Sequence, residues 1–331
     1  MMYSVMLTDQ CNLDCRYCYE RDKKNKSMSL AVADNLVDWI LANDQDTIYI
    51  QYHGGEPLLA FETMKYINDK IRQERTVKPR ITTNGSLMNK DIAHYLKECD
   101  YTVYVSVDGD ESVHNENRVD RKGTGSFRKA CEAVDILNKN DVNVYVRGTV
   151  LPSNVDRYFE SVRFLLSNVH HKVGIEPDLF ADDWDDSTIA SYSDQIIKII
   201  RFVQQNAELN YLVSHTNKWE VHRLGICDGG TSNFFIAQNG DIFPCIYAFL
   251  NSDDCIGHIS KGIDNGILSS LRDVYALDNP DCRLCIMNSY CVGTRCKYLN
   301  KYQTGEYLMP SVQVCRILGA SNITVYRHGL A

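Results

Sequence analysis

The sequence predicts an α/β fold with parallel strands, followed by a smaller, cysteine-rich domain. Runs rich in β-branched and aromatic residues alternate with amphipathic helical segments from residue 1 to about 210, and the composition changes after that point. Strands that alternate with helices are usually parallel and joined by right-handed crossovers. This periodicity leaves two arrangements open, a doubly wound sheet and a barrel.

Six strand-like runs carry the first part of this prediction. They are residues 3–7, 47–52, a run ending at 81–83, 101–107, 142–150 and 173–176. Helical segments follow the strands, and Ser29 is expected to cap the first of them. After it, Val32, Leu36 and Ile40 recur at helical spacing. The last helix of this part is expected over residues 189–204.

Composition limits the class of protein. The 331 residues, 44% of them hydrophobic, can bury a large core. A formal net charge of -8 argues against nucleic-acid binding as the main task. Neither a membrane-spanning apolar run nor a signal peptide is recognisable, so we expect no membrane association and a cytoplasmic location. Without an export signal, the 13 cysteines are expected to bind metal and not to form disulfides.

Three cysteines stand shortly after the first strand. Cys11, Cys15 and Cys18 have the spacing C-x3-C-x2-C. Three thiolates in one loop can hold three irons of a [4Fe-4S] cluster and leave the fourth iron open to another ligand. A zinc knuckle is the alternative, but the spacing lacks the paired C-x2-C motifs and histidines that are common at zinc sites. The pattern therefore favours a cluster.

With this motif behind an apolar strand, the chain resembles the radical S-adenosylmethionine (SAM) superfamily. In that family SAM chelates the open iron and is cleaved reductively. The resemblance implies a partial (β/α)6 barrel, expected here over residues 1–212, with the cofactor at the carboxyl ends of the strands. It thereby selects the barrel from the two arrangements that periodicity leaves open.

Two further segments match parts of this family that contact SAM. Gly54, Gly55 and Glu56 match a "GGE" motif that holds the SAM amino group, and paired glycines let a backbone approach a ligand closely. Ser106 and Arg118 resemble the serine and arginine that hold the SAM carboxylate. A guanidinium fork suits a carboxylate.

Four other residues are weaker candidates for this site. Thr83 and Asn84 stand at the end of the third strand, and Arg147 stands on the fifth. Tyr17, just before the third cysteine, resembles the aromatic residue that packs near adenine in the family. Packing in the core is an equally good explanation for this tyrosine.

Cysteines return after residue 215. A hairpin is expected there, because Asn239 and Gly240 are a turn signal between the apolar runs 234–236 and 242–243. Seven of these cysteines follow the order of a SPASM domain, an extension that binds two auxiliary [4Fe-4S] clusters. By this resemblance, residues 213–331 form a small, irregular α+β domain. A zinc ribbon is the alternative, since C-x2-C motifs also bind zinc.

The same resemblance assigns the cysteine ligands. The first auxiliary cluster would be bound by Cys227, Cys245 and Cys296, and the second by Cys282, Cys285, Cys291 and Cys315.

The pattern leaves the fourth ligand of the first auxiliary cluster undetermined. Cys255 is expected to fill it; otherwise one iron is open to substrate. The last gap of the cysteine-rich run is one residue longer than usual in the family, which predicts a bulge at 292–295. Cys99 and Cys131 fall outside both patterns and are expected to be buried apolar thiols.

The resemblance implies three [4Fe-4S] clusters and cleavage of SAM to a 5'-deoxyadenosyl radical. We expect this radical to take a hydrogen atom from a peptide and to start an oxidative modification or crosslink, as in ribosomal peptide maturation. Three alternatives stay open. They are formylglycine formation as in anaerobic sulfatase maturases, a small-molecule radical SAM dehydrogenase, and a non-catalytic iron-sulfur electron carrier.

No catalytic base can be assigned from the sequence. The segments GGEPLL and SVDG resemble sulfatase maturases, which use an aspartate directly after the second SPASM cysteine as a base. Here Ile246 occupies that place, so this base is missing. Asp228, Tyr247 and Glu176 are candidates to stand near the substrate.

The expected partners are a peptide or protein substrate and a flavodoxin- or ferredoxin-type electron donor. Many peptide maturases carry an N-terminal winged-helix module that grips the leader of the precursor. In this sequence the first cluster motif already begins at Cys11. Leader recognition is therefore expected to use another surface or a separate protein, and neither nucleic acid nor a membrane is expected as a partner.

Overall fold

The computed structural model describes residues 1–20, 23–170, 172–206 and 225–328. Within them, one ten-stranded sheet has the order β10-β9-β8-β7-β1-β2-β3-β4-β5-β6. Six strands pair in parallel in chain order, and this confirms the predicted partial barrel. They are β1 (Met2–Met6), β2 (Ile48–His53), β3 (Val77–Thr83), β4 (Thr102–Ser106), β5 (Asn143–Val150) and β6 (Val173–Pro177).

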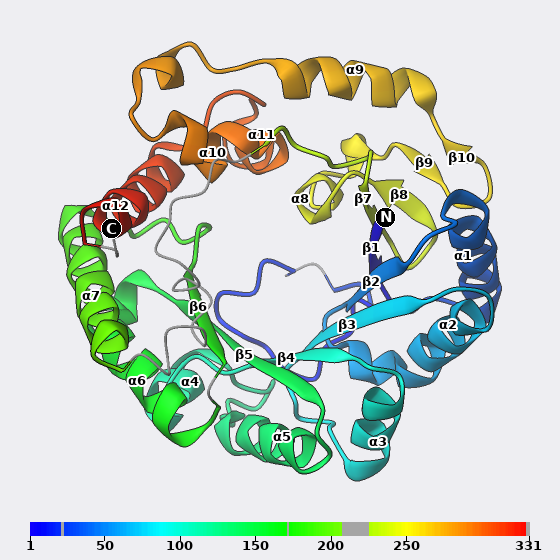
Figure 1. Ribbon diagram of the computed structural model, residues 1–331, viewed down its shortest axis with the longest axis horizontal. Helices are drawn as coiled ribbons and strands as arrows, with labels where there is room; N and C mark the ends of the chain where they lie inside the picture. Colours follow the sequence, from blue (N-terminus) through cyan, green and yellow to red (C-terminus); the bar gives the residue numbers. More distant parts are fainter. Residues whose placement is uncertain (21–22, 171, 207–224, 329–331) are drawn as a thin grey trace.

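Helices surround the parallel strands (Figure 1). They are α1 (Leu30–Asn43), α2 (Phe61–Glu74), α3 (Lys90–Glu98), α4 (Glu111–Asn117), α5 (Phe127–Lys139), α6 (Tyr158–Asn168) and α7 (Asp186–Gln205), with 3-10 turns η1 (Pro57–Ala60) and η2 (Pro152–Arg157). Ser29 caps α1 as predicted, since its hydroxyl accepts a hydrogen bond from the Val32 N–H (3.3 Å). Leu36 and Ile40 are fully buried, as their spacing predicts. In the described part of the chain, no helix has the length and apolar character needed to cross a membrane.

The C-terminal region continues the barrel sheet. Strand β7 (Asn233–Ile236) pairs in parallel with β1, and β8 (Asp241–Phe243) pairs antiparallel with β7. The predicted hairpin turn is present: the Gly240 N–H donates to the Ala237 carbonyl (2.9 Å), and Gly240 has a φ of 94°. Strands β9 (Gly257–His258) and β10 (Gly262–Ile263) extend the sheet. The predicted domain boundary at 212/213 lies outside the described residues.

The remaining elements close the ring between β6 and β1 (Figure 1). They are α8 (Ile246–Phe249), η4 (Ser252–Asp254), α9 (Asn265–Ala276), η5 (Asp281–Leu284), η6 (Asn288–Tyr290), α10 (Val292–Arg295), α11 (Lys297–Thr304) and α12 (Val312–His328). Helix α12 lies beside α7, and Arg316 forms an ion pair with Asp186. The Gln303 amide donates to the Leu179 carbonyl just after β6 (2.7 Å). The C-terminal region is therefore attached to both edges of the barrel.

One local prediction is wrong. Residues 292–295 form the single helical turn α10 and not a loop bulge. The Cys296 N–H donates to the Val292 carbonyl (2.7 Å). The additional residue is accommodated because four residues complete one turn of helix.

Candidate functional site

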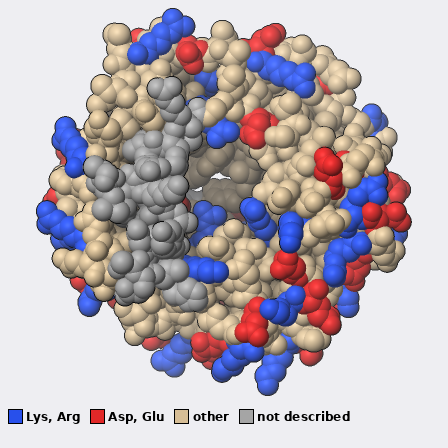
Figure 2. Space-filling model, in the orientation of Figure 1, with Lys and Arg blue, Asp and Glu red and all other residues tan. Residues whose placement is uncertain are grey.

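The carboxyl ends of the parallel strands surround a cavity of about 600 Å³. Figure 2 shows an opening at the centre of this face of the molecule. The predicted residues that line the cavity are Cys11, Cys15, Tyr17, Cys18, Gly54, Gly55, Glu56, Thr83, Ser106, Arg118, Glu176 and Tyr247. Asn84 lines it as well, whereas Arg147 is not among the lining residues and its guanidinium lies 5.5 Å from the centre of the Tyr104 ring. Apart from Arg147, the structure thus brings the candidate SAM contacts together with the cysteines of the loop after β1, here called the cluster loop (residues 8–20).

Gly54 and Gly55 press against the cluster loop. The Gly55 N–H donates to the Thr8 carbonyl (2.9 Å), and the Glu56 N–H donates to the Gln10 carbonyl (2.8 Å). A Cβ atom on Gly54 would lie 2.5 Å from the Thr8 oxygen, and one on Gly55 would lie 2.4 Å from the Gln10 oxygen. Because no side chain fits at these distances, the glycines permit a close backbone contact that fixes the cluster loop at the end of β2.

Glu56 is buried, and donors from its own chain occupy its carboxylate. Oε1 accepts from the Thr83 hydroxyl (2.7 Å) and the Leu58 N–H (3.0 Å), while Oε2 accepts from the Asn84 N–H (2.7 Å). Burial raises the pKa of Glu56, and these hydrogen bonds oppose the shift. Glu56 and Thr83 therefore join the ends of β2 and β3 beneath the two glycines.

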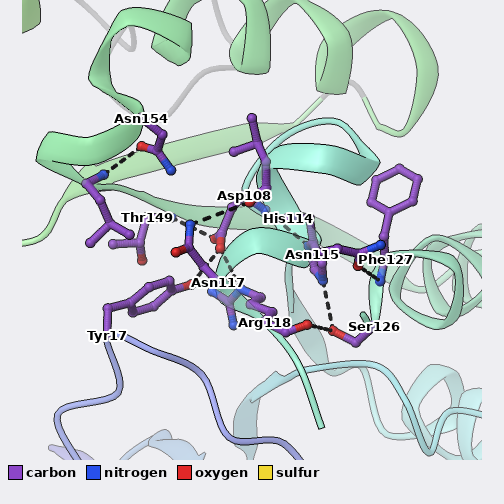
Figure 3. Close-up of polar contacts among 12 residues, drawn as sticks. Tyr17, Asp108, His114, Asn115, Asn117, Arg118, Ser126, Phe127, Thr149 and Asn154 are labelled. Atoms are coloured by element: carbon purple, nitrogen blue, oxygen red, sulfur yellow. Dashed lines mark hydrogen bonds and ion pairs between the residues drawn. The ribbon is translucent and has the colours of Figure 1, made fainter. Parts of the chain in front are cut away.

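Asp108, directly after β4, connects three parts of the site (Figure 3). Its Oδ2 atom accepts from the Tyr17 hydroxyl (2.7 Å) and from Arg118 Nε (3.0 Å), and its Oδ1 atom accepts from the Thr149 N–H (2.9 Å). The Arg118 guanidinium also lies 5.2 Å from the centre of the Tyr17 ring. The Asp108 side chain is fully buried. It therefore fixes Tyr17 and Arg118 relative to each other.

Sequence reasoning gave Asp108 no role. The signal that could have identified it is a carboxylate immediately beyond the carboxyl end of a barrel strand, where functional residues of such folds gather. Burial opposes the charged form of Arg118, but the Asp108 carboxylate raises the pKa of the guanidinium, which stays a cation. Since Asp108 holds Nε and the residue lines the cavity, Arg118 is suited to bind an anionic group there.

Aromatic side chains also line the cavity, namely Tyr19, Phe180 and Tyr247. The Phe180 ring lies 6.2 Å from that of Tyr19, 6.1 Å from Tyr247 and 5.6 Å from Tyr302. Tyr19 belongs to the cluster loop, and Tyr247 belongs to α8 in the C-terminal region. The aromatic contacts therefore connect these two parts of the chain next to the cavity.

The three candidate bases have different positions. Glu176, at the end of β6, and Tyr247 both line the cavity. Asp228 is not among the lining residues, and its carboxylate accepts hydrogen bonds from the Ser232 hydroxyl (2.9 Å) and the Asn233 amide (2.6 Å). Asp228 therefore stabilises a local turn, and its position does not support a role as base.

Ten cysteines form three groups. These are Cys11, Cys15 and Cys18; Cys227, Cys245 and Cys296; and Cys282, Cys285, Cys291 and Cys315. Within each group the thiols are close enough for their charges to interact. The pKa of Cys15 is raised to about 11 and that of Cys245 to about 12, mainly by burial, and the other thiols of each group contribute in the same direction. The groups have the same membership as the predicted ligand sets.

The donors fit iron-sulfur clusters. In the chain as described, no three His, Cys, Asp or Glu side chains meet where a single metal ion could bind all of them. A four-iron cluster does not require the thiols to converge on one point, because each thiolate binds a different iron. Three sets of neighbouring thiols supply the ligand type that such clusters use.

The remaining cysteines are Cys255, Cys99 and Cys131. The Cys255 thiol, between η4 and β9, donates to the Gly257 carbonyl (3.2 Å), and its assignment as fourth ligand stays a prediction. Cys99 is buried at the end of α3 and accepts a hydrogen bond from Arg72 (2.6 Å). Cys131 is partly buried in α5.

Comparisons with known proteins bear on the family and the fold. Residues 5–166 match the family model of the radical SAM superfamily. The chain is 24% identical over 321 residues to the radical SAM cyclopropyl synthase TigE of Paramaledivibacter caminithermalis, and the alignment covers 87% of this chain and 66% of that protein. It is 24% identical over 288 residues to a cysteine-type anaerobic sulfatase-maturating enzyme of Clostridium novyi, with 77% of this chain and 75% of that protein covered. The chain spans only part of the length of three curated relatives that it matches. The aligned part is 57% of the first, 66% of TigE and 43% of the third.

Solved structures extend the comparison to the C-terminal region. Native anSMEcpe with bound AdoMet and the Cp18Cys peptide matches with a TM-score of 0.83 at 16% identity, over 98% of this chain and 96% of that chain. The shared fold thus includes the elements beyond residue 166. Given the family match from β1 to α6 and the cysteine spacing in the cluster loop, the chain belongs to the radical SAM superfamily.

Proposed function

We propose that this protein binds SAM and three [4Fe-4S] clusters and removes a hydrogen atom from a C–H bond of a peptide, which is then oxidised or crosslinked. The cavity at the strand ends carries this proposal. Its lining contains the cysteines of the cluster loop and Arg118, and also Tyr247, two residues after Cys245. A substrate in this cavity would lie between the SAM cluster and the first auxiliary cluster.

The chain would supply ligands, orientation and exclusion of water. When bound, a reduced [4Fe-4S] cluster and SAM supply a 5'-deoxyadenosyl radical, which takes one hydrogen atom from the substrate. We assign the cluster to Cys11, Cys15 and Cys18 and the SAM carboxylate to Arg118 with Ser106. The carbonyls of Gly54 and Gly55 would accept hydrogen bonds from the SAM amino group, and Tyr17 would pack beside the adenine.

The C-terminal cysteines would serve the second half of the reaction. After the hydrogen atom has left, oxidation to a closed-shell product requires that the substrate radical lose one more electron. The cysteine groups of the C-terminal region would hold two clusters that can accept it. A one-electron donor of the ferredoxin or flavodoxin type would supply the electron that starts each turnover. In this scheme residues 1–212 generate the radical, and residues 213–331 accept the electron.

A peptide substrate is supported by the relatives. The name of the sulfatase-maturating enzymes states that they act on a protein, the sulfatase. The structure of anSMEcpe has been solved with a bound peptide. Formylglycine formation is the second candidate, because of the similarity to the Clostridium novyi enzyme over 77% of this chain. Against it stands Ile246, at the place where the resemblance to sulfatase maturases calls for an aspartate base.

The test is an anaerobic assay with SAM, dithionite and candidate peptides. We expect formation of 5'-deoxyadenosine and a mass change in a peptide that is co-expressed with the protein. A conversion of serine or cysteine to formylglycine would favour the second candidate. Turnover of a small molecule with all peptides unchanged would favour a dehydrogenase, and an intact cluster set without SAM cleavage would favour an electron carrier.

A further inference from the structure

Lys297 is a buried cation in the C-terminal region. It is the first residue of α11, directly after Cys296, and is 3% exposed. Its ammonium donates to the carbonyls of Leu277 (2.7 Å) and Thr294 (2.9 Å). Within the described residues it forms no ion pair with a carboxylate. Lysine is rarely buried to this extent without a charged partner, so this position requires an explanation.

The ammonium lies beside the backbone of both C-terminal cysteine groups. Lys297 directly follows Cys296, and Thr294, whose carbonyl accepts from the ammonium, donates its hydroxyl to the Cys291 carbonyl (2.8 Å). The charges that act on the ammonium come from Asp278, Cys282 and Cys227. Cys227 belongs to the group with Cys245, whereas Cys282 belongs to the other group. One cation therefore faces ligands from both groups.

A second lysine on the same helix shows the usual arrangement. Lys301, four positions further along α11, forms an ion pair with Asp254 and a hydrogen bond with the Tyr307 hydroxyl (3.0 Å). Its charge is balanced within the protein. Among the described residues, Lys297 forms no such ion pair, and the carboxylate of Asp278 acts on it only from beyond ion-pair distance. A charge without a close partner in a protein interior is strongly unfavourable.

Bound clusters would provide the missing negative charge. Cysteine ligands bind as thiolates, and a cluster with four thiolate ligands carries a net negative charge that increases on reduction. A cation in a site of low dielectric interacts with such a charge more strongly than it would in water. The stabilisation is larger for the reduced cluster, because that form is the more negative one.

We propose that the Lys297 ammonium is the shared counter-charge of the two auxiliary clusters and raises the reduction potential of both. The inference rests on the proposed function, since it requires that the C-terminal cysteines bind clusters. A higher potential makes each cluster a better acceptor for the electron that leaves the substrate radical. Lys297 thereby acts through the charge of its ammonium on the clusters and does not touch the substrate.

The test compares two substitutions at this position. Lys297→Gln keeps an amide that can donate to the neighbouring carbonyls but removes the charge, whereas Lys297→Arg keeps the charge. Reduction potentials are measured by redox titration of the anaerobically purified protein, followed by electron paramagnetic resonance (EPR). We expect both auxiliary potentials to become more negative in K297Q and to stay near wild type in K297R. The cluster at Cys11, Cys15 and Cys18 is the internal control, because its potential should not change.

Lys301→Gln is the matched control, since it removes the same charge from the same helix. Unchanged auxiliary potentials in K297Q, or an equal shift in K301Q, would overturn the proposal. If K297Q does not retain the auxiliary clusters, Lys297→Met is titrated in its place. Loss of auxiliary iron in both neutral variants, with retention in K297R, would support the requirement for charge.

Iron and sulfide analysis of the wild-type protein separates this inference from the proposed function. Wild-type protein with iron for one cluster alone would contradict the assignment of auxiliary clusters. Wild-type protein with three clusters, whose potentials do not respond to K297Q, would contradict the role of Lys297 alone.

Discussion

The hydroxyl of Tyr17 donates a hydrogen bond of 2.7 Å to the carboxylate of Asp108. The two residues are 91 positions apart, one in the cluster loop and the other directly after β4. Because Asp108 is fully buried and also pairs with Arg118, the contact holds the cluster loop against the strand ends at the cavity. The site is thus fixed by a polar contact within the chain as well as by any bound group.

Removal of this hydrogen bond should destabilise the protein. Tyr17→Phe leaves a buried charged acceptor with one donor fewer, so we expect a loss of about 2 kcal/mol in the free energy of unfolding. Tyr104→Phe, whose ring packs against Tyr145 at 5.4 Å, is the control and should have a smaller effect. Anaerobic thermal and denaturant unfolding would measure both. Equal stability of the two variants would contradict the role of the Tyr17–Asp108 contact.

A side chain at Gly55 should displace the cluster loop. In Gly55→Ala the new Cβ would lie 2.4 Å from the Gln10 carbonyl oxygen, a backbone atom that cannot move without the loop. We expect the iron content to fall by the share of one cluster and SAM cleavage to be lost, while auxiliary EPR signals persist. Gly319→Ala in α12, where nothing lies within 4 Å of the added atom, should retain all iron. Full iron content in G55A would show that the contact is not required.

The cysteine groups should be separable by mutation. Replacing Cys11, Cys15 and Cys18 together with alanine should abolish SAM cleavage and leave the auxiliary iron, because the other cysteine groups belong to the C-terminal region. Iron and sulfide analysis with an assay for 5'-deoxyadenosine checks both parts. Loss of all clusters, or surviving SAM cleavage, would contradict this division of labour.

Cys255 is predicted to complete the first auxiliary cluster. Its thiol is partly buried shortly after the hairpin that leads to Cys245, although it contacts the Gly257 carbonyl in this structure. Cys255→Ala should therefore alter the EPR or Mössbauer signals of one auxiliary cluster and open an iron to a small added thiol. Unaltered signals, with no newly coordinable iron, would exclude Cys255 as the ligand.

Stability should fall in acid through His114. Burial, followed by the charge of Arg118, lowers the pKa of His114 to about 4, whereas an unfolded histidine has a pKa of about 6.5. The unfolded chain binds the proton more readily, so the stability contribution is present above pH 6.5 and is lost as the pH falls toward 4. His114→Gln should reduce the loss between pH 7 and pH 5 by about 2 kcal/mol.

His94→Gln is the control for this pH dependence. The His94 side chain is 70% exposed, so this variant removes a histidine from the surface and not from the interior. His53, whose pKa is also lowered to about 4, first by burial, should account for part of the acid sensitivity that remains in the His114 variant. An unchanged stability profile in His114→Gln would contradict the assignment.

The sequence by itself determined the strands and helices of the barrel and the type of side chain, cysteine, that is expected to bind the clusters. Strand and helix periods are set by neighbouring residues, so the six parallel strands and the Ser29 cap could be predicted within a few positions. The spacing of Cys11, Cys15 and Cys18 is likewise local, because three thiols in one short loop must lie near one another. The resemblance to radical SAM enzymes, and not the alternation of strands and helices, implied that Gly54, Ser106 and Arg118 would lie at one site at the carboxyl ends of the strands.

Only the tertiary structure decided which of these residues hold one another in place. Asp108 becomes the link between Tyr17 and Arg118 because folding buries its carboxylate beside both. The role inferred for Lys297 also depends on the tertiary structure. Its burial and its proximity to Cys227 and Cys282 result from the packing of η5, α10 and α11. Burial and charge pairing between distant segments leave no periodic pattern in the sequence, because they arise only when folding brings those segments together.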